Sequence, residues 1–168
     1  MTSVVLDAIN RQISSEFSAS FSYLSMSAWC QKENYVGAAQ WLRLQSQEEH
    51  GHAMKLFDFV LARGGEIKLE TIEVPKAKFK SLIDVFEQAL AQEQAVSKQI
   101  DALYELAFKE KVFAAMAELQ WFLTEQVEEE KTAREIVARL QMVGKDPASI
   151  IDVDRDLGGR AGAEDASK

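Results

Sequence analysis

Apolar residues recur at alternating steps of three and four along four long segments of the chain. This spacing places apolar side chains on one stripe of a helix, which then packs against a core. Only two prolines and eight glycines occur in 168 residues, so helix breakers are scarce. The pattern predicts an all-α protein with long helices over residues 3–33, 36–63, 79–108 and 110–143.

The connections between these segments predict how the helices are arranged. The first two segments meet tightly around Asn34 and Tyr35, and the last two meet near Lys109, so each pair is expected to form an antiparallel hairpin. The stretch GEIKLETIEVPKAK between the hairpins is long enough to run the length of a bundle. Two hairpins joined by one long crossover form a known four-helix bundle topology.

Cap signals set the expected ends of the later elements. Gly64 and Gly65 follow the second segment and are expected to form a left-handed cap there. Asp146 as cap and Pro147 at the first position predict a short fifth helix that ends near residue 157. Residues 1–157 are therefore expected to form one domain, and the small, polar tail 158–168 is expected to be flexible.

Composition narrows the class of protein and its partners. Hydrophobic residues make up 47% of the chain and charged residues 27%, a balance that supports a buried core. The formal net charge of −8 argues against nucleic acid as a partner and favours cations. Neither a signal peptide nor a membrane-spanning run is recognisable, and a single cysteine, Cys30, excludes an internal disulfide. We therefore expect a cytoplasmic protein without membrane contact.

Each predicted long helix carries a carboxylate in the middle of its apolar stripe. The stripe of the second helix consists of Leu42, Gln45, Glu49, His52, Leu56 and Phe59. Burying an ionised carboxylate without a partner costs several kcal/mol, so something must compensate for these acids. Positions at mid-helix share one layer of a bundle, and the side chains expected to converge there are Glu16, Glu49, His52, Glu93, Gln126 and Glu129.

The converging side chains favour a pair of redox-active metal ions. Four clustered carboxylates repel one another, and two divalent cations would cancel their charge. Carboxylate oxygens with one imidazole, that of His52, suit iron or manganese. Tyr23, seven residues after Glu16, fits either core packing or a redox partner, and Trp121 is interpreted as a packing residue.

A second set of acids lies beside the first in the sequence. These acids lie next to the converging side chains in the sequence or one helical turn from them, and this spacing places them on one patch of surface. They permit two interpretations, a solvated run of charge or an accessory metal site formed by Glu48, Glu125, Glu128 and Glu129.

The segments that carry these acids resemble the bacterial and archaeal non-haem ferritins. The resemblance spans nearly the whole chain, through NRQISSEFSASFSYLSMSAWC, QEEHGHAMKLFDFVLARGG and LQWFLTEQVEEEK. Its specific motifs are EExxH and EQxEEE. The second motif places Gln126-x-x-Glu129 where other di-iron bundles carry Glu-x-x-His, a form that these ferritins have and bacterioferritins lack. The resemblance implies a ferritin-like four-helix bundle with one long crossover and a short fifth helix.

The resemblance also implies a ferroxidase centre within each subunit. Its catalytic residues would be Glu16, Glu49 and His52 at the first iron, with Glu49 bridging, Glu93, Gln126 and Glu129 at the second, and Tyr23 beside them. The second acidic set would bind a third iron. Fe(II) would be oxidised by oxygen or hydrogen peroxide and stored as ferric mineral in a hollow shell of 24 subunits. No haem is expected, although His50 stands where relatives often carry an apolar residue.

Three other classes were weighed against this interpretation. A di-iron peroxidase of the rubrerythrin kind, acting in oxidative-stress defence without bulk storage, is the main alternative. Such proteins usually add a cysteine-rich iron domain, which Cys30 alone cannot build. A mini-ferritin that guards DNA takes its ligands from two subunits, whereas this chain supplies a full set. A bundle without metal is disfavoured by the buried acids.

Overall fold

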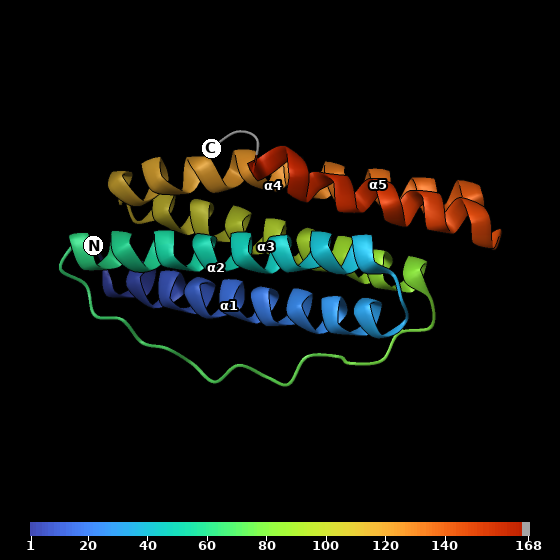
Figure 1. Cartoon of the computed structure of the whole chain (residues 1–168). Coiled ribbons are helices and arrows are strands. Elements are labelled where there is room, and N and C mark those ends of the chain that lie inside the picture. Colours follow the sequence, from blue (N-terminus) through green and yellow to red (C-terminus); the bar gives the residue numbers. More distant parts are fainter. Residues whose placement is uncertain (166–168) are drawn as a thin grey trace.

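The protein is an all-α bundle, as the sequence predicts. The structure, a computed structural model, describes residues 1–165, with side chains through residue 159. Its five helices are α1 (Ser3–Lys32), α2 (Val36–Ala62), α3 (Leu82–Lys109), α4 (Phe113–Val143) and α5 (Pro147–Asp165). The first four run along the length of the molecule, and α5 packs beside one end of the bundle (Figure 1).

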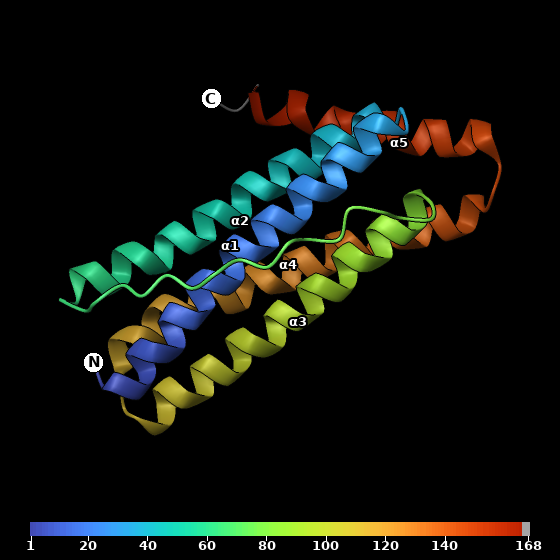
Figure 2. The same cartoon turned by 90° about the horizontal axis from the view of Figure 1, so that it is seen from below.

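Two antiparallel hairpins, α1–α2 and α3–α4, form the bundle. The segment between α2 and α3 is extended and runs along the whole length of the bundle beside α1 (Figure 2). Because the chain crosses back before α3 begins, α2 and α3 run in the same direction (Figure 1). The predicted topology of two hairpins and one long crossover is confirmed.

Three of the long helices end in the same way, which explains the tight turns. Asn34, Gly64 and Lys111 have φ values of 67°, 66° and 55°. The next backbone N–H in each case donates to a carbonyl five residues back, as in Tyr35 to Cys30 at 2.9 Å. The left-handed conformation predicted for Gly64 is therefore present, and two residues that are not glycine adopt it as well.

Two helices begin three residues later than the sequence pattern predicts. The start of α3 at Leu82, not residue 79, follows from Ser81, whose side chain accepts a hydrogen bond from the Asp84 N–H at 3.3 Å. The start of α4 at Phe113, not residue 110, follows from the turn at Lys111.

At the C-terminal end, α5 continues to Asp165, beyond the predicted end at residue 157, and is still the shortest helix. Residues 166–168 of the predicted flexible tail lie outside the described residues, so that flexibility stays a prediction.

The docking of α5 depends on a contact with the start of α2. The Asp154 carboxylate accepts hydrogen bonds from the backbone N–H groups of Gly37 at 3.2 Å and Ala38 at 2.7 Å. These N–H groups belong to the first turn of α2 and have no partner within that helix. A Cβ at Gly37 would lie 1.8 Å from the carbonyl oxygen of Asp154, so only glycine permits this approach.

The core consists of two apolar clusters with a polar layer between them. One cluster lies toward the end where α5 docks and includes Tyr23, Leu42, Phe86 and Leu140. The other lies toward the opposite end and includes Ile9, Leu56, Ile100 and Phe122. Along every long helix the buried acid predicted as a ligand falls between the two clusters, in the single layer that the sequence predicts.

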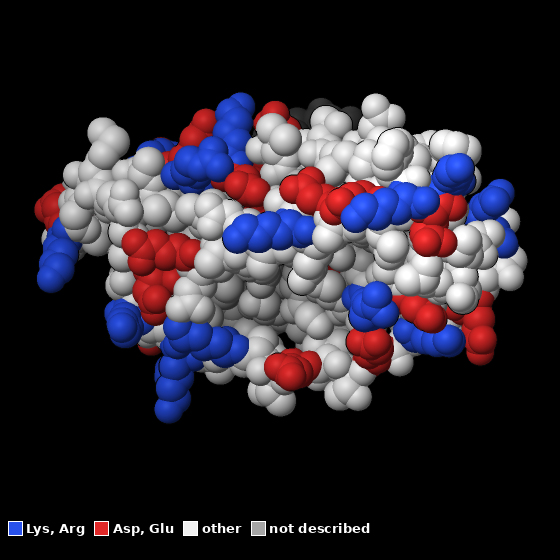
Figure 3. Space-filling view, turned by 180° about the vertical axis from the view of Figure 1, so that it is seen from behind, with Lys and Arg blue, Asp and Glu red and all other residues white. Residues whose placement is uncertain are grey.

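The surface carries charges of both signs. Acidic and basic side chains are interleaved across the face seen in Figure 3, so the net negative charge is not gathered there. Within residues 1–165, no helix combines the length and the apolar character needed to cross a membrane.

Candidate metal centre

The polar layer of the core brings together the side chains predicted for the di-iron centre. All four long helices contribute, one acid from each. The residues are almost fully buried, with exposed fractions of 0% for Glu16 and Glu49, 1% for Glu93, 4% for Gln126, 6% for His52 and 9% for Glu129. Such burial of four carboxylates in one layer requires protons or cations to balance their charge.

The first group in this layer is formed by Glu16, Glu49 and His52. Each offers a ligand atom, and these atoms lie within 4.8 Å of one another. His52 Nδ1 lies 3.3 Å from Glu49 Oε2 without forming a hydrogen bond to it. Within the described part of the chain, four buried atoms of this group have no hydrogen-bond partner, namely Glu16 Oε2, Glu49 Oε1, Glu49 Oε2 and His52 Nδ1. Oxygen and imidazole nitrogen donors in this arrangement fit a hard divalent cation.

A second group extends the first toward α4. Ligand atoms of His52, Glu125 and Glu129 also lie within 4.8 Å of one another. Glu93 belongs to neither group among the described residues, and both oxygens of its carboxylate accept hydrogen bonds. Its Oε1 accepts from the Tyr23 hydroxyl, and its Oε2 accepts from Gln126 Nε2 at 3.2 Å.

Two glutamines that sequence reasoning did not assign to the centre hold its carboxylates. Gln12 Nε2 donates to Glu16 Oε1 at 2.8 Å, and Gln45 Nε2 donates to Glu129 Oε2 at 2.6 Å. A signal was present for both, since Gln12 and Gln45 each lie four residues before a predicted ligand on the same helix face. Gln45 nevertheless bonds across the bundle to α4, which helix spacing alone does not reveal.

Burial and mutual repulsion raise the pKa values of the clustered acids. Burial first, and then the charge of Glu49, raises the pKa of Glu16 to about 8. Burial and the charge of Glu93 raise the pKa of Glu129 to about 7. The same two causes raise the pKa of Glu49, and burial raises that of Glu93. Without metal, the layer therefore retains protons near neutral pH, and a divalent cation can displace them.

The Tyr23 hydroxyl lies inside the layer, in contact with Glu93. Burial and the charge of Glu93 raise the pKa of Tyr23 above its usual range, so the phenol stays protonated. Both interpretations of Tyr23 remain open, because it belongs to an apolar cluster and also contacts a predicted ligand.

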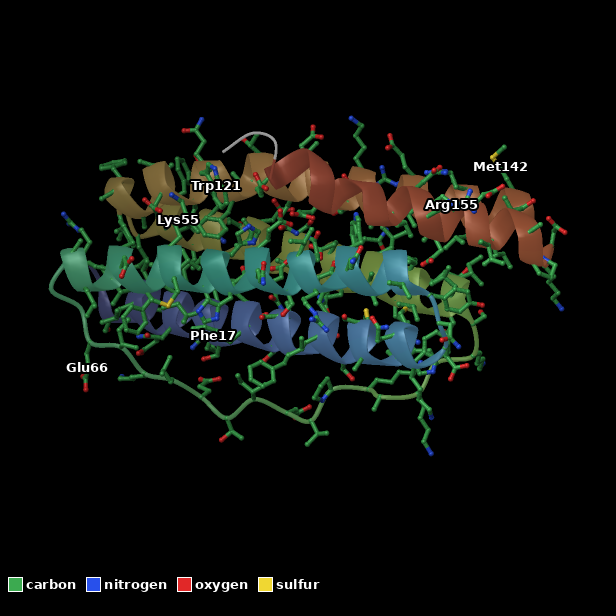
Figure 4. The ribbon with its side chains drawn as sticks, in the orientation of Figure 1. Phe17, Lys55, Glu66, Trp121, Met142 and Arg155 are labelled. Atoms are coloured by element: carbon green, nitrogen blue, oxygen red, sulfur yellow. The ribbon has the colours of Figure 1, made fainter. Side chains whose placement is uncertain are left out.

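The two histidines of the chain lie in different surroundings. His52 packs edge-on against Trp121, with ring centroids 5.3 Å apart, and against Phe122. Lys55 lies 5.0 Å from the Trp121 ring and pairs with Glu118 at 3.3 Å, so this corner joins α2 to α4 (Figure 4). Trp121, predicted to be a packing residue, packs against His52 and Phe122 but is 40% exposed, so it lies at the edge of the core. His50 is exposed and lies outside the layer, with its ring tilted by 60° against Phe17 and the ring centroids 5.3 Å apart.

The residues predicted for a third iron site are only partly brought together. Glu48 and Glu125 are half-buried beside the layer, and Glu125 joins the group with His52 and Glu129. Glu128 is exposed, and its carboxylate lies 3.7 Å from Lys131 Nζ. Among the described residues, the observed group therefore contains Glu125 and Glu129 of the predicted third site, and neither Glu48 nor Glu128 belongs to it.

Comparison with known proteins places this bundle in a family. The family model of the ferritin-like domain matches residues 6–143, which include all the residues of the polar layer. The chain belongs to the ferritin family. Its resemblance to the non-haem ferritins is confirmed by a bacterial non-heme ferritin of Staphylococcus epidermidis that is 37% identical over 94% of this chain and 95% of that protein.

Other ferritins give the same result. A bacterial non-heme ferritin of Staphylococcus aureus is 34% identical over 93% of this chain and 94% of its own length. Among solved structures, an open pore ferritin from the archaeon Archaeoglobus fulgidus superposes with a TM-score of 0.93 at 40% identity, over 94% of this chain and 98% of that one. The four-helix bundle is therefore that of the ferritins.

Proposed function

We propose that this ferritin-family chain oxidises Fe(II) to Fe(III) at the polar layer and stores the product as a ferric mineral. The observation that carries the proposal is the set of four buried, unpartnered ligand atoms on Glu16, Glu49 and His52. Leaving such atoms unsatisfied costs about 1–3 kcal/mol each, which a bound cation would recover. Membership of the ferritin family supports iron as that cation.

In this proposal the first Fe(II) is bound by Glu16, Glu49 and His52. The second is bound by Glu129 and Glu93, with Gln126 nearby and Glu49 bridging the two ions. Binding displaces the protons that the metal-free acids retain. A ligand shell rich in carboxylate oxygen favours Fe(III) over Fe(II), so the site promotes oxidation.

Two neighbouring irons match the electron demand of the oxidant. Each Fe(II) gives up one electron, and oxygen takes up two electrons and two protons to become hydrogen peroxide. Hydrogen peroxide, as the oxidant, would take up two electrons and two protons and yield two molecules of water. The half-buried acids Glu48 and Glu125 would form the third iron site and support transfer of iron away from the centre.

Storage requires an assembly with an interior, and we propose a hollow shell of 24 copies in the cytoplasm. The relatives named as ferritins support this assembly. A di-iron peroxidase of the rubrerythrin kind would use a similar cluster without a shell. Native mass spectrometry and particle images distinguish the two, because a peroxidase that does not store iron is expected as a small oligomer.

The stoichiometry of metal binding tests the centre itself. An anaerobic Fe(II) titration of the metal-free protein should show two ions bound per chain, followed by weaker binding of a third. Saturation at one ion per chain would rule out a di-iron centre. The matched variant Glu128→Ala should keep the first two ions, since Glu128 lies outside both ligand groups among the described residues.

A further inference from the structure

Gln12 is a buried polar side chain that the proposed iron chemistry does not yet use. It lies on α1, four residues before Glu16, and is only 4% exposed. A buried amide must find partners for its donors, and both of its N–H groups do so. Gln12 Nε2 donates to Glu16 Oε1 at 2.8 Å and to Gln99 Oε1 at 3.4 Å.

These two contacts fix the direction in which the amide points. Gln99 Oε1 also accepts a hydrogen bond from the Ser15 hydroxyl at 2.7 Å, so this oxygen is already oriented as an acceptor. Turning the Gln12 amide around would place its own oxygen against the Glu16 carboxylate and against Gln99 Oε1. Both contacts would be repulsive when Glu16 is ionised, as it must be to bind a metal ion, so the N–H groups face Glu16 in that state.

The consequence is that the two oxygens of Glu16 are not equivalent. Oε1 is occupied by the Gln12 amide, whereas Oε2 is buried without a partner. Glu49 provides the contrast within the same group, because neither of its oxygens has a hydrogen-bond partner among the described residues. Glu16 is thus prepared to offer one oxygen to a metal ion, and Glu49 is prepared to offer two.

We propose that Gln12 is a positioning residue that makes Glu16 a one-oxygen ligand and thereby sets the coordination number and affinity of the first metal ion. The amide nitrogen has no free lone pair and does not bind the metal itself. Removing it would free Oε1, and Glu16 could then bind one ion through both oxygens. This inference rests on the proposed metal centre, although it does not depend on the identity of the metal.

Cobalt(II) gives a readout that is independent of iron oxidation. The visible absorption of bound Co(II) weakens as its coordination number rises, so the spectrum reports how many oxygens Glu16 supplies. In Gln12→Met the side chain keeps its length and loses its donors. We expect a weaker Co(II) absorption band and a 10–100-fold change in Co(II) affinity, about the effect of removing a hydrogen-bond partner of a metal ligand.

The matched control is Gln92→Met on α3. The Gln92 amide nitrogen is buried without a hydrogen bond, so this substitution removes no hydrogen bond from that nitrogen to a predicted ligand. This variant should reproduce the spectrum and affinity of the parent. A general effect of inserting methionine into the bundle would alter both variants alike and would overturn the inference.

The remaining outcomes separate this inference from the proposed centre. If Gln12→Met binds Co(II) with the parent's spectrum and affinity, the positioning role is wrong and the metal centre stands. The proposed centre itself is wrong if the parent binds no Co(II), or if His52→Ala binds Co(II) as the parent does. Should Gln12→Met fail to fold, Gln99→Leu decides, because it removes the second anchor of the amide and leaves the first, at Glu16. It also removes the acceptor of the Ser15 hydroxyl, in an exposed hydrogen bond away from Glu16. A smaller shift in the same direction supports the role, and an unchanged spectrum overturns it.

Discussion

The two halves of the polar layer differ in how their carboxylates are satisfied. On the α1–α2 side, four ligand atoms of Glu16, Glu49 and His52 are buried without hydrogen bonds. On the α3–α4 side, Glu93 accepts bonds from Tyr23 and Gln126 through both oxygens. One half is therefore incomplete without an ion, whereas the other is largely satisfied by protein donors.

This difference predicts the order and strength of metal binding. An ion at the α1–α2 side replaces unfavourable desolvation with ligand bonds, and little has to move. An ion at the α3–α4 side must share oxygens that already accept hydrogen bonds from protein donors, which costs part of the energy that binding releases. The first ion should therefore bind more tightly than the second.

The largest expected effect comes from removing the acid with two free oxygens. Glu49→Ala should slow the fast phase of Fe(II) oxidation by at least about a hundredfold. Changing a residue that only hydrogen bonds to a metal ligand already costs up to about a hundredfold, and Glu49 is a predicted ligand itself. Stopped-flow absorbance measures this phase. Glu128→Ala is the control and should retain the fast phase, with changes confined to later turnover. Equal fast phases in Glu49→Ala and the parent would refute the assignment.

A smaller effect separates the two histidines. His52→Ala removes the only nitrogen ligand of the first group and should slow oxidation by about 10–100-fold. His50→Ala removes an exposed ring that packs at a tilt against Phe17, and oxidation should stay near the parent rate. The protein should also purify without haem. A Soret band that appears on adding haem to the parent and is lost in His50→Ala would contradict this.

The pH dependence of stability should reveal the protons held by the metal-free layer. The pKa of Glu16 is raised from 4.5 to about 8, so the folded protein binds this proton more tightly than the unfolded chain. Its contribution to stability is complete below pH 4.5 and is lost as pH rises to about 8. Each unit of pKa shift corresponds to about 1.4 kcal/mol. Urea unfolding of metal-free protein should therefore show a free energy of unfolding that falls by several kcal/mol across this range.

Zinc, which has no redox chemistry, should reverse that loss. An ion that binds only the folded state stabilises it by about 2.7 kcal/mol at a hundredfold excess over its dissociation constant. The stabilisation should be greatest near pH 8 and weaken toward pH 5, where protons compete for the ligands. The variant Glu16→Gln should flatten the pH dependence of the metal-free protein. A parent whose stability rises between pH 4.5 and 8 would show that the layer does not retain protons.

The sequence was sufficient to place the buried acids in one layer, because bundle geometry converts spacing along a helix into position. Glu16, Glu49, Glu93 and Glu129 lie at mid-helix on apolar stripes, and antiparallel packing places mid-helix residues in one layer. Whether these side chains take the proposed roles stays a prediction. The lengths of the connections between the helices were also sufficient to predict the two hairpins and the crossover.

What the sequence did not reveal depends on contacts between helices or on turns without glycine. The Gln45 amide bonds to Glu129 from another helix, and no spacing rule predicts which carboxylate it meets. The left-handed turn at Lys111 carries no glycine signal, so the start of α4 was placed too early. The exposed position of Glu128 follows from its rotation on α4, which adjacency to other acids does not report.

The smallest expected effect concerns Tyr23, whose hydroxyl donates to Glu93 on the satisfied side of the layer. Tyr23→Phe should assemble and bind two Fe(II) per chain, because the ring remains in its apolar cluster. Loss of one hydrogen bond should cost about 1 kcal/mol of folding stability in metal-free protein. The substitution should also free Glu93 Oε1, so the second ion should bind slightly more tightly, and the difference in affinity between the two halves of the layer should narrow.

If the Tyr23 hydroxyl also supplies an electron during oxygen reduction, the ratio of iron oxidised to oxygen consumed will change in Tyr23→Phe. Anaerobic titration measures the affinity for the second ion, and an oxygen electrode measures the ratio of iron oxidised to oxygen consumed. If the ratio is unchanged and the second ion binds more tightly, the only role of the Tyr23 hydroxyl is to hold Glu93. If neither the ratio nor the affinity for the second ion changes, Tyr23 is a core residue.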